Sequence, residues 1–156
     1  MLIRKAKQQD IDQILILLKE VLEIHASIRP DIFNHGVTKY TKEELNDMIK
    51  DINNPIYVAV DDNNVLLGYV FCNTRYPSNT HIMKYRKTLY IDDFCIKEEY
   101  RNKSIGKTLF KYIKEEATKL GYDDITLTVW NNNEPAVKFY EKLGFKVRMK
   151  YMEFKL

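Results

Sequence analysis

The chain has 156 residues, of which 45% are hydrophobic and 30% charged, as is typical of one globular domain (residues 1–156) with its own core. These fractions exclude a disordered tail, a collagen-like repeat and a coiled coil. The 25 basic and 22 acidic residues leave a formal net charge of only +3, which argues against a partner made of nucleic acid.

In chain order, the first half is predicted to form strand 2–6, helix 10–26, a helix from 41 to about 52, and strands 56–60 and 65–72. Pro30 ends the first helix. Thr41 and Glu44 form a capping box that starts the second. Residues 61–64 are rich in Asp and Asn and suit a tight turn, so the two strands around them are expected to pair antiparallel.

The second half is predicted to form strand 88–97, a helix that begins near Ile105 and ends at Gly121, strand 125–130, helix 134–143 capped by Gly144, and strand 145–154. The full order is β-α-α-β-β-β-α-β-α-β. Because a helix joins strand 88–97 to strand 125–130, these two are expected to be parallel in an otherwise antiparallel sheet.

The cysteines and the N-terminus carry no sign of a metal site, a membrane span or secretion. Cys72 and Cys95 belong to no CxxC pair and are predicted to be buried, reduced thiols, so no metal is expected. Residues 1–13 lack the apolar core of a signal peptide, and the longest apolar run, 14–18, is too short to cross a bilayer. We therefore expect a cytoplasmic protein that does not bind membranes.

The stretch from Ile96 to Gly106 (IKEEYRNKSIG) ends a strand, passes through a basic loop and starts a helix. The unpaired N–H groups and the dipole of a helix start favour phosphate binding. Arg101, Lys103 and Lys107 add positive charge. A plain solvated connection is the alternative interpretation.

Residues 101–106 (RNKSIG) resemble the [RQ]-x-x-G-x-[GA] acetyl-CoA loop of the GNAT superfamily of N-acetyltransferases, and residues 133–145 (NEPAVKFYEKLGF) resemble that family's second signature. The predicted element order matches the family over essentially the whole chain. The resemblance implies a mixed α/β fold, with a mostly antiparallel sheet of six to seven strands flanked by about four helices. It also implies acetyl transfer from acetyl-CoA, as co-substrate, to a primary amine of a small molecule or protein. A non-catalytic acyl-CoA-binding or interaction module on the same fold is the alternative.

The resemblance further implies roles for individual residues. The backbone of strand residues 94–96 would pair with the pantetheine arm, and Tyr140 would protonate the departing thiolate. The implied cofactor-binding residues are Phe94, Cys95, Ile96, Arg101, Asn102, Lys103, Ser104, Ile105, Gly106, Lys107 and Asn133. Dimers are common in this family, so a homodimer is an open expectation.

Ser104 departs from the family pattern, which has glycine there. If the position requires a positive φ, serine is strained, and if it is the N-cap of the helix, serine is favoured. We prefer the N-cap interpretation, and we interpret the retained Gly106 as the point where the helix backbone approaches the pyrophosphate most closely.

The acceptor side is predicted less specifically. Asp92 and Asp93 lie in an apolar strand, with side chains expected on opposite faces, and each is a candidate general base or a member of a salt bridge. His25, Arg29 and Asp31 fall in a segment that often lines the acceptor pocket in the superfamily, although a dipole contact for the histidine and an ion pair for the arginine are alternatives.

Two further features bear on the acceptor. Thr128 stands where alanine acetyltransferases that act on ribosomal proteins carry a catalytic glutamate, which argues against that activity. The basic, aromatic loop 73–87 is predicted to be a lid over the acceptor, a simple connection or a dimer contact.

Overall fold

The structure, a computed structural model, describes residues 1–78 and 81–156. Its strands are β1 (Leu2–Lys5), β2 (Ile56–Val60), β3 (Leu66–Arg75), β4 (Thr88–Ile96) and β5 (Asp124–Leu127). Its α-helices are α1 (Ile11–Ile28), α2 (Lys42–Met48), α3 (Ile105–Lys119) and α4 (Glu134–Lys142), with short 3-10 turns at Gln8–Asp10 and Glu98–Tyr100. The strands form one sheet in the order β1-β2-β3-β4-β5. All neighbours are antiparallel except β4 and β5, which confirms the predicted parallel pair.

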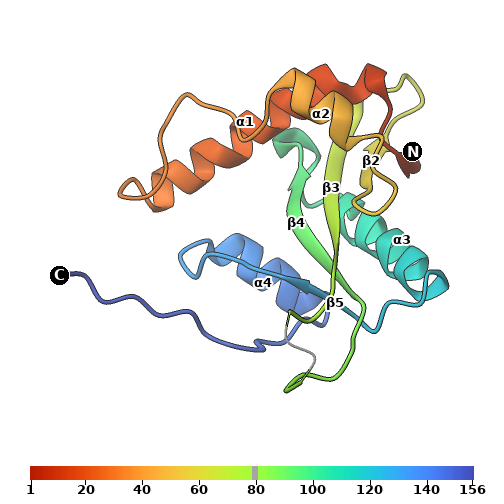
Figure 1. Cartoon of the computed structure of the whole chain (residues 1–156). Helices are drawn as coiled ribbons and strands as arrows, with labels where there is room; N and C mark the ends of the chain where they lie inside the picture. The colour runs from red at the N-terminus through yellow and green to blue at the C-terminus, as the bar shows by residue number, and fades with distance from the viewer. Residues whose placement is uncertain (79–80) are drawn as a thin grey trace.

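Helices cover both faces of the sheet (Figure 1). Apolar residues of α1 and α2, among them Ile14 and Leu45, pack on one face, and those of α3, among them Leu109 and Ile113, pack on the other. The predicted mixed α/β fold class is therefore confirmed.

The ends of several elements follow the local signals in the sequence. Thr41 Oγ1 accepts from the Glu44 amide at 3.1 Å and the Glu44 carboxylate accepts from the Thr41 amide at 2.7 Å, so the capping box is present. Gly121 (φ +69°) and Gly144 (φ +95°) adopt the left-handed conformation that closes α3 and α4. α2 ends at Met48, before the predicted position near 52.

The prediction of a sixth strand at 145–154 is wrong for this chain. Residues 145–156 form no regular structure. Phe145 packs against Phe110, and residues 146–156 then leave α4 as an exposed, extended segment (Figure 1). The described sheet therefore has five strands, fewer than the six to seven expected. The segment has the alternation of a strand, but its backbone from 146 to 156 forms no hydrogen bond with the backbone of any described residue.

One buried ion pair ties β1 to the start of α1. Asp10 is 1% exposed, and its carboxylate accepts from Arg4 Nη1 at 2.6 Å, from Arg4 Nη2 at 2.9 Å and from the Lys7 amide at 2.7 Å. Burial raises the pKa of Asp10, but these hydrogen bonds outweigh it and hold the pKa below its usual value.

Candidate active site

The two parallel strands β4 and β5 separate halfway along β4. Their pairing runs only from Thr88 with Asp124 to Ile91 with Leu127, where β5 ends. From 92 to 96, β4 has β3 on one side and, among the described residues, no strand on the other. This free edge includes residues 94–96, which the sequence predicts to face the pantetheine arm.

The turn between β4 and α3 exposes a run of backbone donors. Among the described residues, no acceptor pairs with the backbone N–H groups of 102–107, and the first helical bond runs from Thr108 N to Ser104 O at 3.0 Å. Asn102 and Ser104 both have a φ of +61°. Successive amides in left-handed and turn conformations form a concave nest that binds anions. The strand-loop-helix junction thus has the backbone geometry of a phosphate site.

The N-cap interpretation of Ser104 is right about its position and wrong about its conformation and hydrogen bonding. Ser104 occupies the N-cap position of α3, but its φ of +61° is left-handed and its side chain makes no capping hydrogen bond. The position therefore requires the positive φ that favours glycine, and serine is strained there.

Gly106 is constrained by packing within the protein. A Cβ at this buried position would lie 3.0 Å from Phe139 Cζ and 3.4 Å from Ile96 Cγ1. Because Gly106 has no side chain, α3 can pack against the Phe139 ring of α4. This packing alone explains the glycine, without the predicted close approach to the pyrophosphate.

The basic side chains around the nest are exposed but partly engaged. Arg101 Nε donates to Ile96 O at 3.0 Å, and Lys103 Nζ lies 5.2 Å from the centre of the Tyr100 ring. Lys107 extends from the first turn of α3 into solvent. Arg101 thus links the end of β4 to the loop.

A β-bulge changes the orientation of the two strand aspartates. Phe71 pairs with Asp93 while Cys72 pairs with Ile91, so Asp92 is an extra residue in β4. Lys39 Nζ lies 2.7 Å from Asp92 Oδ2 and 3.6 Å from Asp93 Oδ2. Both carboxylates therefore meet one lysine, and the expectation that they point to opposite faces is wrong because the bulge resets the alternation.

The two carboxylates differ in environment. Asp92 also accepts from Tyr40 Oη at 3.2 Å and is the more exposed of the pair. Asp93 is deeply buried and accepts from Tyr69 Oη at 3.2 Å. Burial raises the pKa of Asp93 above its usual value, although Lys39 and the Tyr69 hydroxyl oppose the rise.

Tyr140 stands in an aromatic cluster at the splay of the sheet. Its ring centre lies 6.3 Å from Phe94, 5.3 Å from Phe139 and 5.7 Å from Phe145. Burial raises the pKa of Tyr140, and the charge of Asp93 adds to the rise, so the phenol stays protonated at neutral pH. No described residue hydrogen-bonds its hydroxyl.

The predicted acceptor residues gather at the end of α1. The Arg29 guanidinium forms a two-point ion pair with Asp31 at 2.8 and 2.9 Å and lies 5.3 Å from the centre of the Trp130 ring. The His25 ring lies 5.3 Å from that of Phe33, and burial, aided by the positive charge of Lys39, lowers the pKa of His25. The ion pair that the sequence left as an alternative for Arg29 is present.

The predicted cofactor residue Asn133, and Thr128 at the position that lacks the glutamate, both have structural partners. Asn133 is the N-cap of α4, and its Oδ1 accepts from the Ala136 amide at 3.3 Å. Thr128 Oγ1 accepts from Tyr90 Oη at 3.1 Å.

Sequence reasoning missed Lys39 and Trp130. Lys39 lies in a polar segment before α2 and carries no local signal of its contact with β4. Trp130 is the one tryptophan of the chain and follows β5, which was a usable signal. The lid prediction for loop 73–87 includes residues 79 and 80, which lie outside the described residues, and Asn73 to Arg75 belong to β3.

Both cysteines are buried and free, as predicted. Burial raises the pKa of each thiol to about 12. Cys95 is therefore protonated at neutral pH and unsuited to act as a nucleophile.

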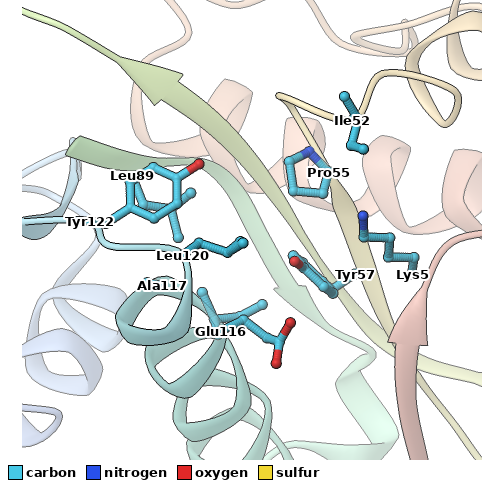
Figure 2. A pocket seen from close by; sticks show the side chains of 10 residues that line it. Lys5, Ile52, Pro55, Tyr57, Leu89, Glu116, Ala117, Leu120 and Tyr122 are labelled. Carbon is cyan, nitrogen blue, oxygen red and sulfur yellow. The ribbon is translucent and has the colours of Figure 1, made fainter. Parts of the chain in front are cut away.

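A separate cavity of about 150 Å³ opens between the start of β2 and the end of α3. Figure 2 shows Tyr57, Glu116 and Tyr122 around it. It contains none of the residues predicted for the cofactor or the acceptor. The described helices include none long and apolar enough to span a membrane, and no cluster of three metal-ligating side chains occurs among the residues described.

The candidate site thus combines parallel strands that separate, a nest of unpaired amides at the start of α3 and a tyrosine whose ring lies near Phe94 of β4. The family model described as "Acetyltransferase (GNAT) family" matches residues 18–145, and the chain belongs to this family.

Individual relatives agree with this assignment. L-ornithine N5-acetyltransferase NATA1 from Arabidopsis thaliana is 34% identical over 53% of this chain and 35% of its own length. A putative phosphinothricin acetyltransferase, YwnH, from Bacillus subtilis is 29% identical over 58% of this chain and 53% of its own. The chain thus spans about half or less of these relatives. The crystal structure of a mutant BH1408 protein from Bacillus halodurans superposes with a TM-score of 0.95 at 29% identity, over 100% of this chain and 99% of that one.

Proposed function

We propose that the protein transfers an acetyl group from acetyl-CoA to a primary amine by direct attack within a ternary complex. The observation that carries the proposal is the run of unpaired backbone N–H groups from 102 to 107 at the start of α3. A pyrophosphate is the anion that such a run of donors suits, because each amide can donate without breaking a helical bond.

The free edge of β4 supports the same proposal. The backbone between 92 and 96 lacks a strand on the β5 side, and an extended amide-containing chain such as pantetheine can hydrogen-bond there. Acetyl-CoA supplies the activated acyl group. The residues of this chain hold it, exclude water and handle the protons.

Tyr140 is the proposed acid. Its raised pKa keeps the phenol protonated at neutral pH, so it can hydrogen-bond to the thioester sulfur and donate its proton as the C–S bond breaks; the resulting phenolate then regains a proton from solvent. Its hydroxyl donates to no described residue and is therefore available. Tyr140→Phe should lower kcat by about 100-fold with little change in CoA affinity, since a positioned acid contributes on the order of 100-fold or more.

Asp93 is the proposed base, acting directly or through water. Of the two aspartates it is the more buried, and burial raises its pKa, which strengthens it as a proton acceptor. Asp92 accepts from Lys39 and Tyr40, so its proposed role is to hold that lysine beside the site. Asp93→Asn should lower kcat more than Asp92→Asn does.

The acceptor is proposed to be a small amine bound near His25, Arg29 and Asp31. NATA1 and YwnH are named for the free amino compounds ornithine and phosphinothricin, so these are the first acceptors to test. The assay incubates the protein with acetyl-CoA, a panel of such amines and peptides with free N-termini, and a thiol-reactive dye that reports CoA release. Release that depends on the amine supports the proposal. If no amine gives release while CoA still raises the Tm, the result favours the alternative of a non-catalytic acyl-CoA-binding module.

The nest can be tested apart from turnover. Lys107→Pro removes one unpaired amide in the first turn of α3, where proline is tolerated, and Lys107→Ala removes the charge alone. CoA affinity by isothermal titration should fall about tenfold further for Lys107→Pro than for Lys107→Ala, because a hydrogen bond to a charged group contributes about 1.5 kcal/mol. Equal affinities would show that the amides do not bind the pyrophosphate.

A further inference from the structure

The cavity between the start of β2 and the end of α3 has the size of a site for one small molecule. Its volume is about 150 Å³. An apolar protein cavity of about this volume holds one benzene ring. None of the residues assigned to the cofactor or the acceptor lines it, so it is a second, separate space in the fold.

The walls of the cavity are largely apolar from its base to its mouth. Leu89 of β4 and Ile113 and Ala117 of α3 line it and are buried. Ile52 and Leu120 also line it, and they are 78% and 54% exposed, so apolar side chains continue to the surface at the opening. Such a lining favours a ligand with an apolar body over water alone.

One polar group at the cavity lacks a partner within the part of the chain that the structure describes. Tyr57 of β2 is 2% exposed, yet its hydroxyl hydrogen-bonds to no described residue. Every fully enclosed side-chain N or O atom described here has a partner, so the Tyr57 hydroxyl is open to the cavity. The other tyrosine hydroxyl there is engaged, because Tyr122 Oη lies 2.6 Å from Thr74 Oγ1. A buried tyrosine hydroxyl normally finds a partner, and a ligand can supply this one.

A carboxylate lies on the opposite side of the cavity from β2. Figure 2 shows Tyr57 on its strand and Glu116 on α3, both at the cavity. Glu116 Oε1 accepts from Lys119 Nζ at 2.8 Å, and its side chain is 27% exposed. Its second carboxylate oxygen remains available as an acceptor. Burial raises the pKa of Tyr57 and the charge of Glu116 adds to the rise, so the Tyr57 hydroxyl keeps its proton as a donor.

The charges around the cavity cancel. Lys5 of β1 is the cross-strand partner of Tyr57 and lines the cavity with its exposed cationic side chain. Among the described residues that line the space, Lys5 and Glu116 are the charged ones, and their signs are opposite. A charged ligand therefore gains no net attraction there, although it loses its hydration. This balance favours a neutral ligand.

We propose that this cavity binds a small neutral aromatic alcohol of the size of phenol. The ring packs on Leu89, Ile113 and Ala117. The ligand hydroxyl accepts a hydrogen bond from Tyr57 Oη and donates one to the Glu116 carboxylate, so the unpartnered donor and the free acceptor are both satisfied. Water could satisfy the same two groups but would leave the apolar wall without contacts. The site is independent of acetyl transfer, and its test uses no activity.

The first experiment titrates the isotope-labelled full chain with phenol and follows its backbone amides by NMR. The amides of Tyr57, Leu89 and Ala117 should shift and saturate with a Kd on the order of 1 mM. Benzoate and benzylammonium have the same ring with a charge and should bind at least about tenfold more weakly at these amides. No saturation up to about 10 mM phenol, equal binding of a charged compound, or shifts confined to other parts of the chain would each overturn the proposal.

A second experiment tests the hydrogen bond. Tyr57→Phe keeps the ring and removes the hydroxyl, so phenol affinity should fall about fivefold while the affinity for benzene stays the same. The matched control Tyr112→Phe removes a hydroxyl from the ring 5.7 Å from that of Tyr57, on a residue that does not line the cavity. It should change neither affinity. Equal effects of the two substitutions on phenol would show that Tyr57 does not bind the ligand hydroxyl.

A third experiment fills the space. Ala117→Leu adds three carbons to a side chain that is 4% exposed and lines the cavity, so binding of both phenol and benzene should be lost. Circular dichroism checks that the variant is folded, and Leu89→Phe fills the same space from β4 if it is not. A folded, filled variant that still binds phenol with the wild-type affinity would place the ligand elsewhere and refute the site.

Discussion

Ser104→Gly is expected to stabilise the ligand-free protein, although it removes a hydroxyl group at a helix start. Ser104 has a φ of +61° and makes no capping hydrogen bond, so the hydroxyl contributes nothing that glycine would lose. A non-glycine residue in the left-handed region costs about 1–2 kcal/mol. Glycine loses about 0.4–1 kcal/mol more backbone entropy on folding. The net gain should be about 0.5–1 kcal/mol, or roughly 1–4 °C in Tm for a chain of this size.

Two controls separate backbone strain from capping. Ser104→Ala keeps the Cβ and removes the hydroxyl, so strain predicts a change of less than about 0.5 kcal/mol, while a lost N-cap would cost about 1 kcal/mol. Asn64→Gly changes another residue with a φ of +61°, in the turn between β2 and β3. Asparagine tolerates this conformation better than serine, so its replacement should gain less. Urea unfolding of all three variants is the assay. A loss of about 1 kcal/mol in both Ser104→Ala and Ser104→Gly would refute the strain argument and restore the capping interpretation.

Three other predictions concern the core. Gly106→Ala should destabilise the protein by about 1 kcal/mol because its Cβ would press on Phe139. The loss should be smaller in a Phe139→Leu background, and a double-mutant cycle by urea unfolding measures the difference. Asp10→Asn should cost about 3 kcal/mol because it leaves Arg4 without its buried partner. Because the pKa of Asp10 is lowered in the folded protein, its contribution to the free energy of unfolding is complete above the unfolded pKa, about 4, and is lost as the pH falls through the folded pKa. Below about pH 4 the free energy of unfolding of Asp10→Asn should therefore depend less on pH than that of the wild type. Cys72 and Cys95 should resist a thiol reagent at pH 7.5 and react only after unfolding, and a reactive native thiol would contradict their burial.

The parts of the fold that the sequence predicts correctly are those that local chemistry decides. The Thr41–Glu44 capping box needs only four residues to form, and Gly121 and Gly144 end helices because of their own backbone freedom. The parallel pair β4–β5 follows from a helical connection whose handedness and length leave little choice. Each of these signals is complete within a short stretch of chain.

The candidate site depends on longer-range geometry, and there the prediction is partial. The loop 101–106 is recognisable from its residues, but the left-handed backbone of Ser104 is set by the path between β4 and α3. Asp92 and Asp93 are identifiable as carboxylates in an apolar strand. Their shared partner Lys39 is not, because the bulge that turns both toward it arises from a register shift against β3.

The C-terminal residues 146–156 show a different kind of limit. The alternation at 145–151 predicts a strand, but the structure has none there. Alternation fixes which side chains share a face, but it does not say which edge supplies the hydrogen bonds. In this chain residues 146–156 are joined to α4 at one end and ion-paired to Arg29 and Asp31 at the other, while β5 pairs with β4 alone among the described strands. These ion pairs hold the far end of the segment at the end of α1, so contacts between residues more than 120 positions apart decide its path, and no local pattern in the sequence could have predicted them.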